Sequence, residues 1–85
     1  MIDSSQLDAL ARRVTALGFS AAGMAEVRAG FPDLRLTFCL EEELGPAEPF
    51  REYAGFSLHL VGGDHCLALT DDPARAVGVL VAEAS

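Results

Sequence analysis

Apolar residues recur at helical spacing in the first part of the chain. They fall at i, i+3, i+4 and i+7 and form one apolar stripe, made of Leu7, Leu10, Ala11, Val14 and Leu17. Asp3 precedes this run, and Gln6 lies three residues after Asp3, which is the spacing of a capping box. Gly18 is suited to end a helix in the left-handed conformation. The pattern predicts a helix from Asp3 or Ser4 to Leu17.

A second, shorter helix is predicted from Ala21 to Ala29. Ser20 is a favourable N-cap, and Gly30 followed by Pro32 ends the segment. At helical spacing the side chains expected to point inward are Met24, Val27 and Phe31. Gly23 lowers the helix propensity, because glycine costs about 1 kcal/mol relative to alanine inside a helix.

Strict alternation begins at Leu34 and predicts a half-buried strand that ends at Leu40. One face of this strand carries the apolar side chains of Leu34, Leu36, Phe38 and Leu40. The other face carries Arg35, Thr37 and Cys39. Residues 41–54 are polar and interrupted by prolines, so they are expected to form a loop.

Residues 56–70 have the pattern of a β-hairpin that turns at Gly62-Gly63. A two-residue turn pairs Leu60 with His65 and His59 with Cys66. It also gathers the large apolar side chains on one face, namely Phe56, Leu58, Leu60, Leu67 and Leu69. A four-residue loop over 62–65 keeps the same faces and places His59 diagonal to Cys66. Both registers put this His and this Cys on the face away from the core.

The last segment has two interpretations. Asp72 followed by Pro73 favours a helix start, so we expect a helix over Ala74–Ala84. The valine-rich run over 77–81 is also compatible with a fourth strand. With the helix, residues 1–85 form a single small α+β domain in the order α-α-β-β-β-α. Its three-stranded antiparallel sheet is packed by helices on the leucine-rich face.

Composition narrows the possible partners. The chain has 85 residues, 51% of them hydrophobic, so apolar surface is expected to meet a protein partner or a second copy in a homo-oligomer such as a homodimer. A net charge of −7 argues against nucleic acid and anionic membrane as partners. The positive residues are all arginines, which suggests a GC-rich bacterial genome.

No apolar run is long enough to span a membrane, and the first residues lack a signal-peptide pattern, so we expect a cytoplasmic protein.

The candidate chemistry lies on the face of the hairpin away from the core. If the strand of Cys39 is a neighbour in the sheet, Cys39, His59 and Cys66 converge into a donor set for zinc or another thiophilic metal. The alternative is a plain, low-relief face covered by a helix or another subunit. Its members would be Thr37, Cys39, Ser57, Val61, Cys66 and Ala68. In that case no cofactor is expected.

Other features point away from catalysis. The acidic residues of the loop are expected to be a solvated patch or a docking site for a basic protein, and they are Glu41, Glu42, Glu43, Glu48 and Glu52. The sequence has no nucleophile-elbow and no nucleotide-binding motif. We therefore expect a non-enzymatic accessory or protein-interaction module, with a metal-binding protein as the alternative and a small-molecule enzyme as a third hypothesis.

Several segments together resemble a family of small bacterial proteins associated with nitrogen-fixation gene clusters. They are the two N-terminal helices, the strand Leu36–Cys39, and the stretches 55–61 and 65–73. The resemblance implies a cytoplasmic accessory role near nitrogenase or the machinery that builds its metal clusters. It carries over no catalytic residues.

Overall fold

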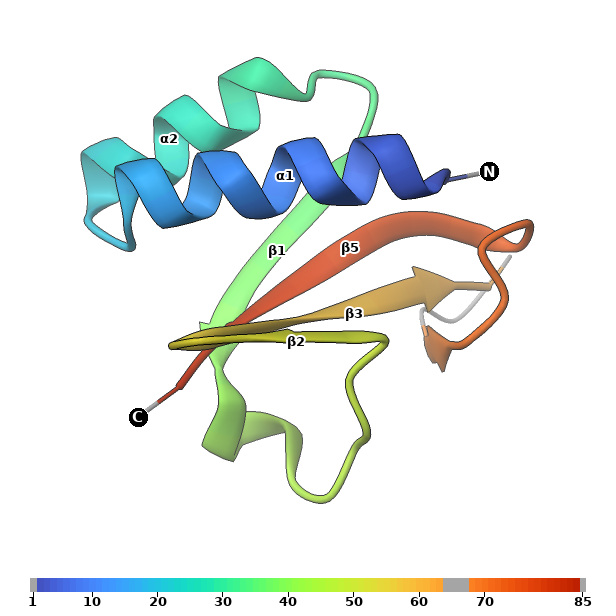
Figure 1. Ribbon diagram of the computed structural model, residues 1–85. Coiled ribbons are helices and arrows are strands. Elements are labelled where there is room, and N and C mark those ends of the chain that lie inside the picture. Colours follow the sequence, from blue (N-terminus) through green and yellow to red (C-terminus); the bar gives the residue numbers. More distant parts are fainter. Residues whose placement is uncertain (1, 64–67, 85) are drawn as a thin grey trace.

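The computed structural model describes residues 2–63 and 68–84. Two helices lie side by side over one face of a sheet, and the segment that follows the first strand loops beneath the opposite face (Figure 1). The helices are α1 (Ser4–Leu17) and α2 (Ala21–Gly30), with bounds close to those predicted.

Local capping explains where both helices begin and end. The Asp3 carboxylate accepts from the Gln6 backbone N–H, and the Gln6 side chain accepts from the Asp3 N–H, which completes the predicted capping box. Gly18 ends α1 with φ 74°, a conformation that favours glycine. The Ser20 hydroxyl accepts from the Gly23 N–H at the start of α2. Both helix predictions are confirmed.

The described residues form a mixed sheet of five strands. They are β1 (Arg35–Leu40), β2 (Arg51–Tyr53), β3 (Phe56–Gly62), β4 (Ala68–Thr70) and β5 (Ala76–Glu83). The order is β1-β5-β3-β2, with β1 and β5 parallel and β3 antiparallel to β5. Two short strands share the far side of β3: β2 pairs with its first half, and β4 pairs with its second half. The expected α+β class is confirmed, whereas the three-stranded antiparallel sheet is wrong.

The predicted C-terminal helix over Ala74–Ala84 is wrong, because this segment forms β5 in the middle of the sheet. Asp72 and Pro73 instead start a tight turn. The Asp72 carboxylate accepts from the Ala74 N–H, and its carbonyl accepts from the Arg75 N–H. The valine-rich run suits either element locally, and here β1 and β3 pair with it on both sides.

The loop expected over residues 41–54 contains regular structure. A short 3₁₀ helix, η1 (Glu41–Leu44), follows β1 directly, and β2 occupies three residues before β3. We call residues 41–50 the arm. Its end joins the sheet through a hydrogen bond from the Phe50 N–H to the Leu58 carbonyl.

The hairpin exists, but its predicted register is wrong. Val61 pairs with Leu69 and Gly62 with Ala68, whereas the two expected registers pair Val61 with Asp64 or with Cys66. This shift reverses which side chains of β4 share a face with those of β3. Leu69 therefore lies beside Val61 and away from Leu58. Residues 64–67, including His65, Cys66 and Leu67, lie outside the described part of the chain.

The core lies between the helices and the sheet, as expected for the leucine-rich face. Its fully buried members come from α1, α2, β3 and β5, and the largest are Leu7, Leu10, Val14, Val27, Leu58, Leu60, Val79 and Val81. Gly78 allows β1 and β5 to approach, because a Cβ there would lie 2.4 Å from the Arg35 carbonyl oxygen.

The opposite side of the sheet, which we call the open face, carries no α-helix among the described residues, and the short 3₁₀ helix η1 of the arm lies beneath it (Figure 1). By register and alternation it carries Arg35, Thr37, Cys39, Ser57, His59, Val61, Leu69, Gly78, Leu80 and Ala82. The arm covers the part of the open face that lies near Ser57 and His59. Within the described residues, neither helix has the length and apolar character needed to cross a membrane.

Candidate functional site

Three side chains form a hydrogen-bonded chain where the arm meets the open face. The Ser57 hydroxyl donates to the Glu41 carboxylate over 2.9 Å. The same hydroxyl oxygen lies 3.1 Å from Nε2 of His59. Ser57 and His59 are two residues apart on β3, so alternation places both on one face, while Glu41 reaches them from η1.

His59 is almost completely enclosed, with 3% of its surface exposed. Its Nδ1 atom forms no hydrogen bond within the described residues. Burial lowers the pKa of His59 below its usual value, because a charged imidazolium loses solvation there. The Glu41 carboxylate and the backbone of Glu48 act in the opposite direction and do not offset this. The ring is therefore neutral near pH 7.

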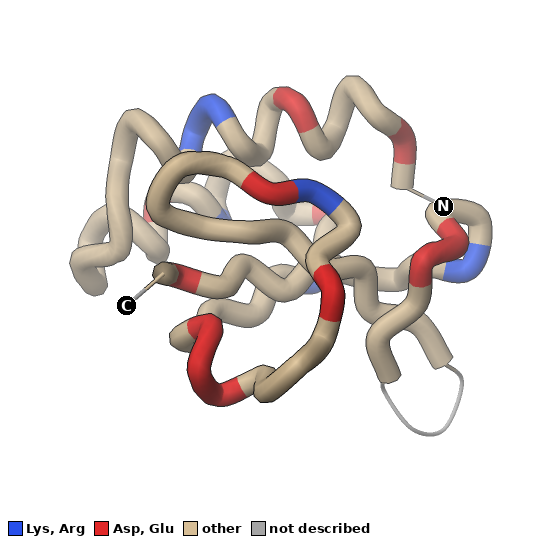
Figure 2. The backbone as a smooth tube through the Cα atoms, turned by 60° about the horizontal axis from the view of Figure 1, so that its bottom comes forward, with Lys and Arg blue, Asp and Glu red and all other residues tan. Residues whose placement is uncertain are grey.

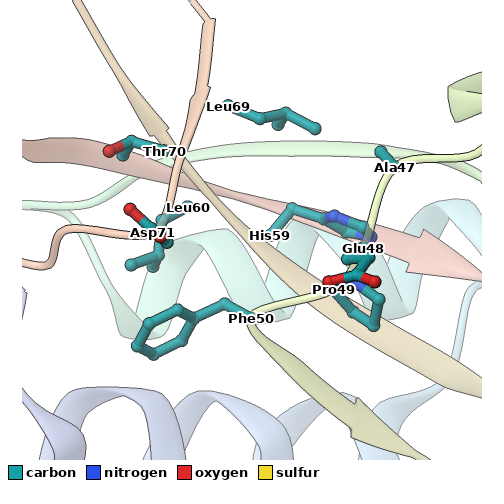
Figure 3. Close-up of a pocket in the computed structure, with 9 residues that line it drawn as sticks. All are labelled: Ala47, Glu48, Pro49, Phe50, His59, Leu60, Leu69, Thr70 and Asp71. Atoms are coloured by element: carbon teal, nitrogen blue, oxygen red, sulfur yellow. The ribbon is translucent and has the colours of Figure 1, made fainter.

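Two hollows flank the His59 ring beneath the arm. The larger has a volume of about 520 Å³, and Figure 3 shows its lining residues coming from the arm, β3 and the end of β4. They are Ala47, Glu48, Pro49, Phe50, His59, Leu60, Leu69, Thr70 and Asp71. The smaller, about 210 Å³, reaches Ser57 and Glu41. Both hollows lie between the arm and the sheet.

The chain of hydrogen bonds differs from that of a hydrolytic triad. In a triad the carboxylate holds the histidine, and the histidine takes the proton of the serine. Here the carboxylate of Glu41 holds Ser57 directly, so the serine proton is directed away from His59. Ser57 is also buried, which leaves its oxygen inaccessible to a substrate carbonyl. The arrangement anchors the arm and does not activate a nucleophile.

The predicted metal set is only partly described. Cys39 and His59 lie on the same face, as expected, but β5 separates their strands. Two strand spacings and a two-residue offset put their backbones about 12 Å apart. Side chains that stand parallel at this separation do not converge on one zinc ion, whose ligand bonds are about 2 Å. The condition that their strands be neighbours is therefore not met.

The third donor, Cys66, lies outside the described residues. Among residues 2–63 and 68–84, no three His, Cys, Asp or Glu side chains are placed to hold a metal ion together. Metal binding by Cys39, His59 and Cys66 stays a prediction.

The thiol of Cys39 is poorly suited to act as a thiolate. Partial burial raises its pKa, and the nearby carboxylate of Glu43 raises it further. The group is therefore protonated near neutral pH. A structural, small apolar role fits this environment.

The Glu41–Ser57 contact is the part of the site that the sequence interpretation missed. The sequence alone predicts that Glu41 belongs to a solvated acidic patch and Ser57 to a plain face. Alternation along β3 places Ser57 and His59 on the same face, so the sequence pattern is sufficient to identify this pair. The contribution of Glu41 depends on how the arm folds back, for which the sequence carries no local signal.

The remaining acidic residues are distributed rather than gathered into a cation site. Figure 2 shows acidic positions spread over the helices, arm and strands, with fewer basic positions among them. In η1, Glu43 accepts from the Leu40 backbone N–H, and Glu42 is exposed. Neither of them forms an ion pair with a described residue.

Comparison with known proteins assigns the chain to a family without assigning an activity. None of the curated proteins matches it, and none of the solved structures does. A family model described as a family of unknown function, DUF6129, matches residues 5–84, which is nearly the whole chain. The protein is a member of the DUF6129 family.

Proposed function

We propose that this protein is a non-enzymatic interaction module that binds protein partners through the open face and the outer edge of β1. The observation that carries the proposal is Leu69, which lies next to Val61 on the open face with 42% of its surface exposed. Thr37 is exposed and Leu80 half-buried on the same face. An exposed face that includes a large apolar side chain is suited to be covered by a protein partner.

The outer edge of β1 adds to this surface. β1 is the terminal strand of the sheet, and no described residue pairs with its outer side. Its sequence, Arg-Leu-Thr-Phe-Cys-Leu, contains neither proline nor lysine. Proteins usually protect such an edge with charges, prolines or a covering element. Arg35 is the only charged residue of β1, so most of this edge is left open to strand pairing with another chain.

The chemistry of the interior supports the non-enzymatic part of the proposal. Ser57 and His59 are buried, and the Glu41 carboxylate accepts a hydrogen bond from the Ser57 hydroxyl. The Cys39 thiol is held in its protonated form. The metal-binding alternative gains no comparable support, since the described donors sit on strands that are not adjacent.

The resemblance to proteins of nitrogen-fixation gene clusters suggests where such a module acts. We extend the proposal to an accessory role near nitrogenase or the assembly of its metal clusters. Capture from a diazotroph grown with and without fixed nitrogen tests this part. A partner set that is the same under both conditions contradicts it.

The interaction surface itself is tested by capture with matched variants. The wild-type chain, a Leu69→Arg variant on the open face and an Arg12→Glu variant on the exposed side of α1 are used as baits. We expect a protein, including a further copy of this chain, to be retained by wild type and Arg12→Glu and released by Leu69→Arg. Equal retention by all variants, with each folded by circular dichroism, contradicts the proposal.

A further inference from the structure

We infer that the partner at the β1 edge is a second copy of this chain, paired antiparallel to β1 about a two-fold axis at Phe38. This inference rests on the proposed function and names the occupant of one part of its surface. The result is a continuous sheet that runs through both copies. The outer edges of the two β1 strands then satisfy each other's backbone N–H and C=O groups, apart from the Leu40 N–H, which already donates to Glu43.

The opposite charges at the two ends of β1 favour pairing with an antiparallel β1 strand from a second copy. Arg35 begins the strand and forms no ion pair with a described residue. Directly after the strand, η1 carries three carboxylates at Glu41, Glu42 and Glu43. An antiparallel copy brings each Arg35 beside η1 of the other copy. A parallel copy would instead align arginine with arginine and glutamates with glutamates.

Symmetry restricts the register further. A two-fold axis perpendicular to the sheet keeps both helix layers on one side, so odd residues must face odd residues and even residues even ones. The choice is therefore among axes at Thr37, Phe38 and Cys39. An axis at Thr37 sets Arg35 opposite Cys39, two residues short of η1. An axis at Cys39 sets Leu36 opposite Glu42.

An axis at Phe38 matches both faces. On the helix side it pairs Leu36 with Leu40 of the second copy, which explains why Leu40 keeps 38% of its surface exposed in one chain. On the open face it pairs Thr37 with Cys39 and sets Arg35 opposite Glu41. Cross-strand apolar and opposite-charge pairs of this kind are the units that stabilise antiparallel strands.

Arg28 also faces the axis and has to be accommodated. Its guanidinium lies 4.9 Å from the centre of the Phe38 ring, on the helix side. Two such groups would approach across the axis and repel each other. Each remains stacked on its own aromatic ring, and both stand at the solvent-exposed side of the pair. Removing this charge with Arg28→Gln is therefore expected to leave the dimer intact or strengthen it.

Exchange of charges tests the ionic pairing. Arg35→Glu and Glu42→Arg are each exposed substitutions, and Glu42 makes no hydrogen bond within the described residues. Each variant alone brings like charges at positions 35 and 42 together at both ends of its homodimer, and we expect dimerisation to weaken by about tenfold or more. In an equimolar mixture the two exchanged charges, at position 35 of one copy and position 42 of the other, are again opposite. Sedimentation velocity over a micromolar concentration series should show the dimer return in the mixture only. Arg12→Glu on α1 is the matched control.

Disulfide trapping tests the register. In a Cys66→Ala background, Thr37→Cys places a thiol opposite Cys39 of the second copy, within the distance that a disulfide spans. With oxidised glutathione we expect a covalent dimer, read by non-reducing electrophoresis and intact mass. Arg35→Cys in the same background is the control, because it faces Cys39 only if the axis lies at Thr37.

The outcomes separate the two proposals. A chain that stays monomeric at high micromolar concentration, or a covalent dimer from Arg35→Cys, overturns the pairing inferred here. If such a monomer still retains another protein that Leu69→Arg releases, the proposed interaction function stands and only the second copy is excluded. A mixture of charge variants that does not recover the dimer overturns the ionic part of the argument, and with it the choice of an antiparallel copy.

Discussion

The Ser57 hydroxyl lies 3.1 Å from Nε2 of His59, and both side chains are buried under the arm. The same hydroxyl donates to the carboxylate of Glu41. One serine thereby joins the middle of the sheet to the segment that leaves β1. These polar contacts add to the packing of Phe50 against the core in holding the arm to the sheet.

Removing the serine hydroxyl should destabilise the protein. Ser57→Ala leaves the His59 Nε2 and the Glu41 carboxylate without their partner, and unsatisfied buried polar groups cost about 1–3 kcal/mol. Urea unfolding should show a loss in that range. Ser5→Ala on the exposed surface of α1 is the control and should change the unfolding free energy by about 0.5 kcal/mol or less. Equal effects of both substitutions would show that the chain of hydrogen bonds does not stabilise the fold.

Acid should weaken the fold through His59. Its pKa in the folded state is lowered from the usual value near 6.5, so the unfolded chain binds the proton more readily. The stabilisation by the neutral ring is complete above this usual pKa and declines as pH falls from there toward the lowered value. The unfolding free energy of wild type should drop in this window more than that of His59→Gln. Parallel pH profiles for the two proteins would contradict the assignment.

Substitution of Gly78 should cost more than a comparable substitution in a helix. A Cβ at Gly78 would lie 2.4 Å from the Arg35 carbonyl oxygen, which is backbone and cannot move without disturbing the β1–β5 pairing. A Cβ at Gly30 meets only the flexible side chain of Arg13. We expect Gly78→Ala to cost about 1–3 kcal/mol and Gly30→Ala less than about 1 kcal/mol. Thermal and urea unfolding of both variants measure the difference.

Two leucines of the hairpin distinguish the observed register from the predicted one. Leu58 is fully buried against the helices, and Leu69 lies exposed on the open face. Leu58→Ala should cost about 2–5 kcal/mol, as is typical of a buried leucine. In the monomer, Leu69→Ala should cost no more than about 0.5 kcal/mol. A large loss from Leu69→Ala at low protein concentration would instead support the tighter hairpin, in which both leucines point into the core.

Local interactions explain why the sequence alone determined the two helices. Each N-cap, at Asp3 and Ser20, binds a backbone N–H three residues away, and each apolar stripe repeats within a few turns. The alternation over 34–40 and 56–62 likewise identified β1 and β3 and put Cys39 and His59 on one face. Such signals need no knowledge of distant residues.

Tertiary structure decided the rest. The apolar run over 77–81 is compatible with the periodicity of a helix or of a strand. Only its pairing with β1 and β3 makes it a central strand of the sheet. The position of β5 then separates Cys39 from His59. The hairpin register depends on the length of its connection, and a shift by one residue moves Leu69 to the other face. Glu41 reaches Ser57 because the arm folds back across the sheet. Each of these outcomes depends on contacts between segments far apart in the chain, and residue patterns within one segment do not encode them.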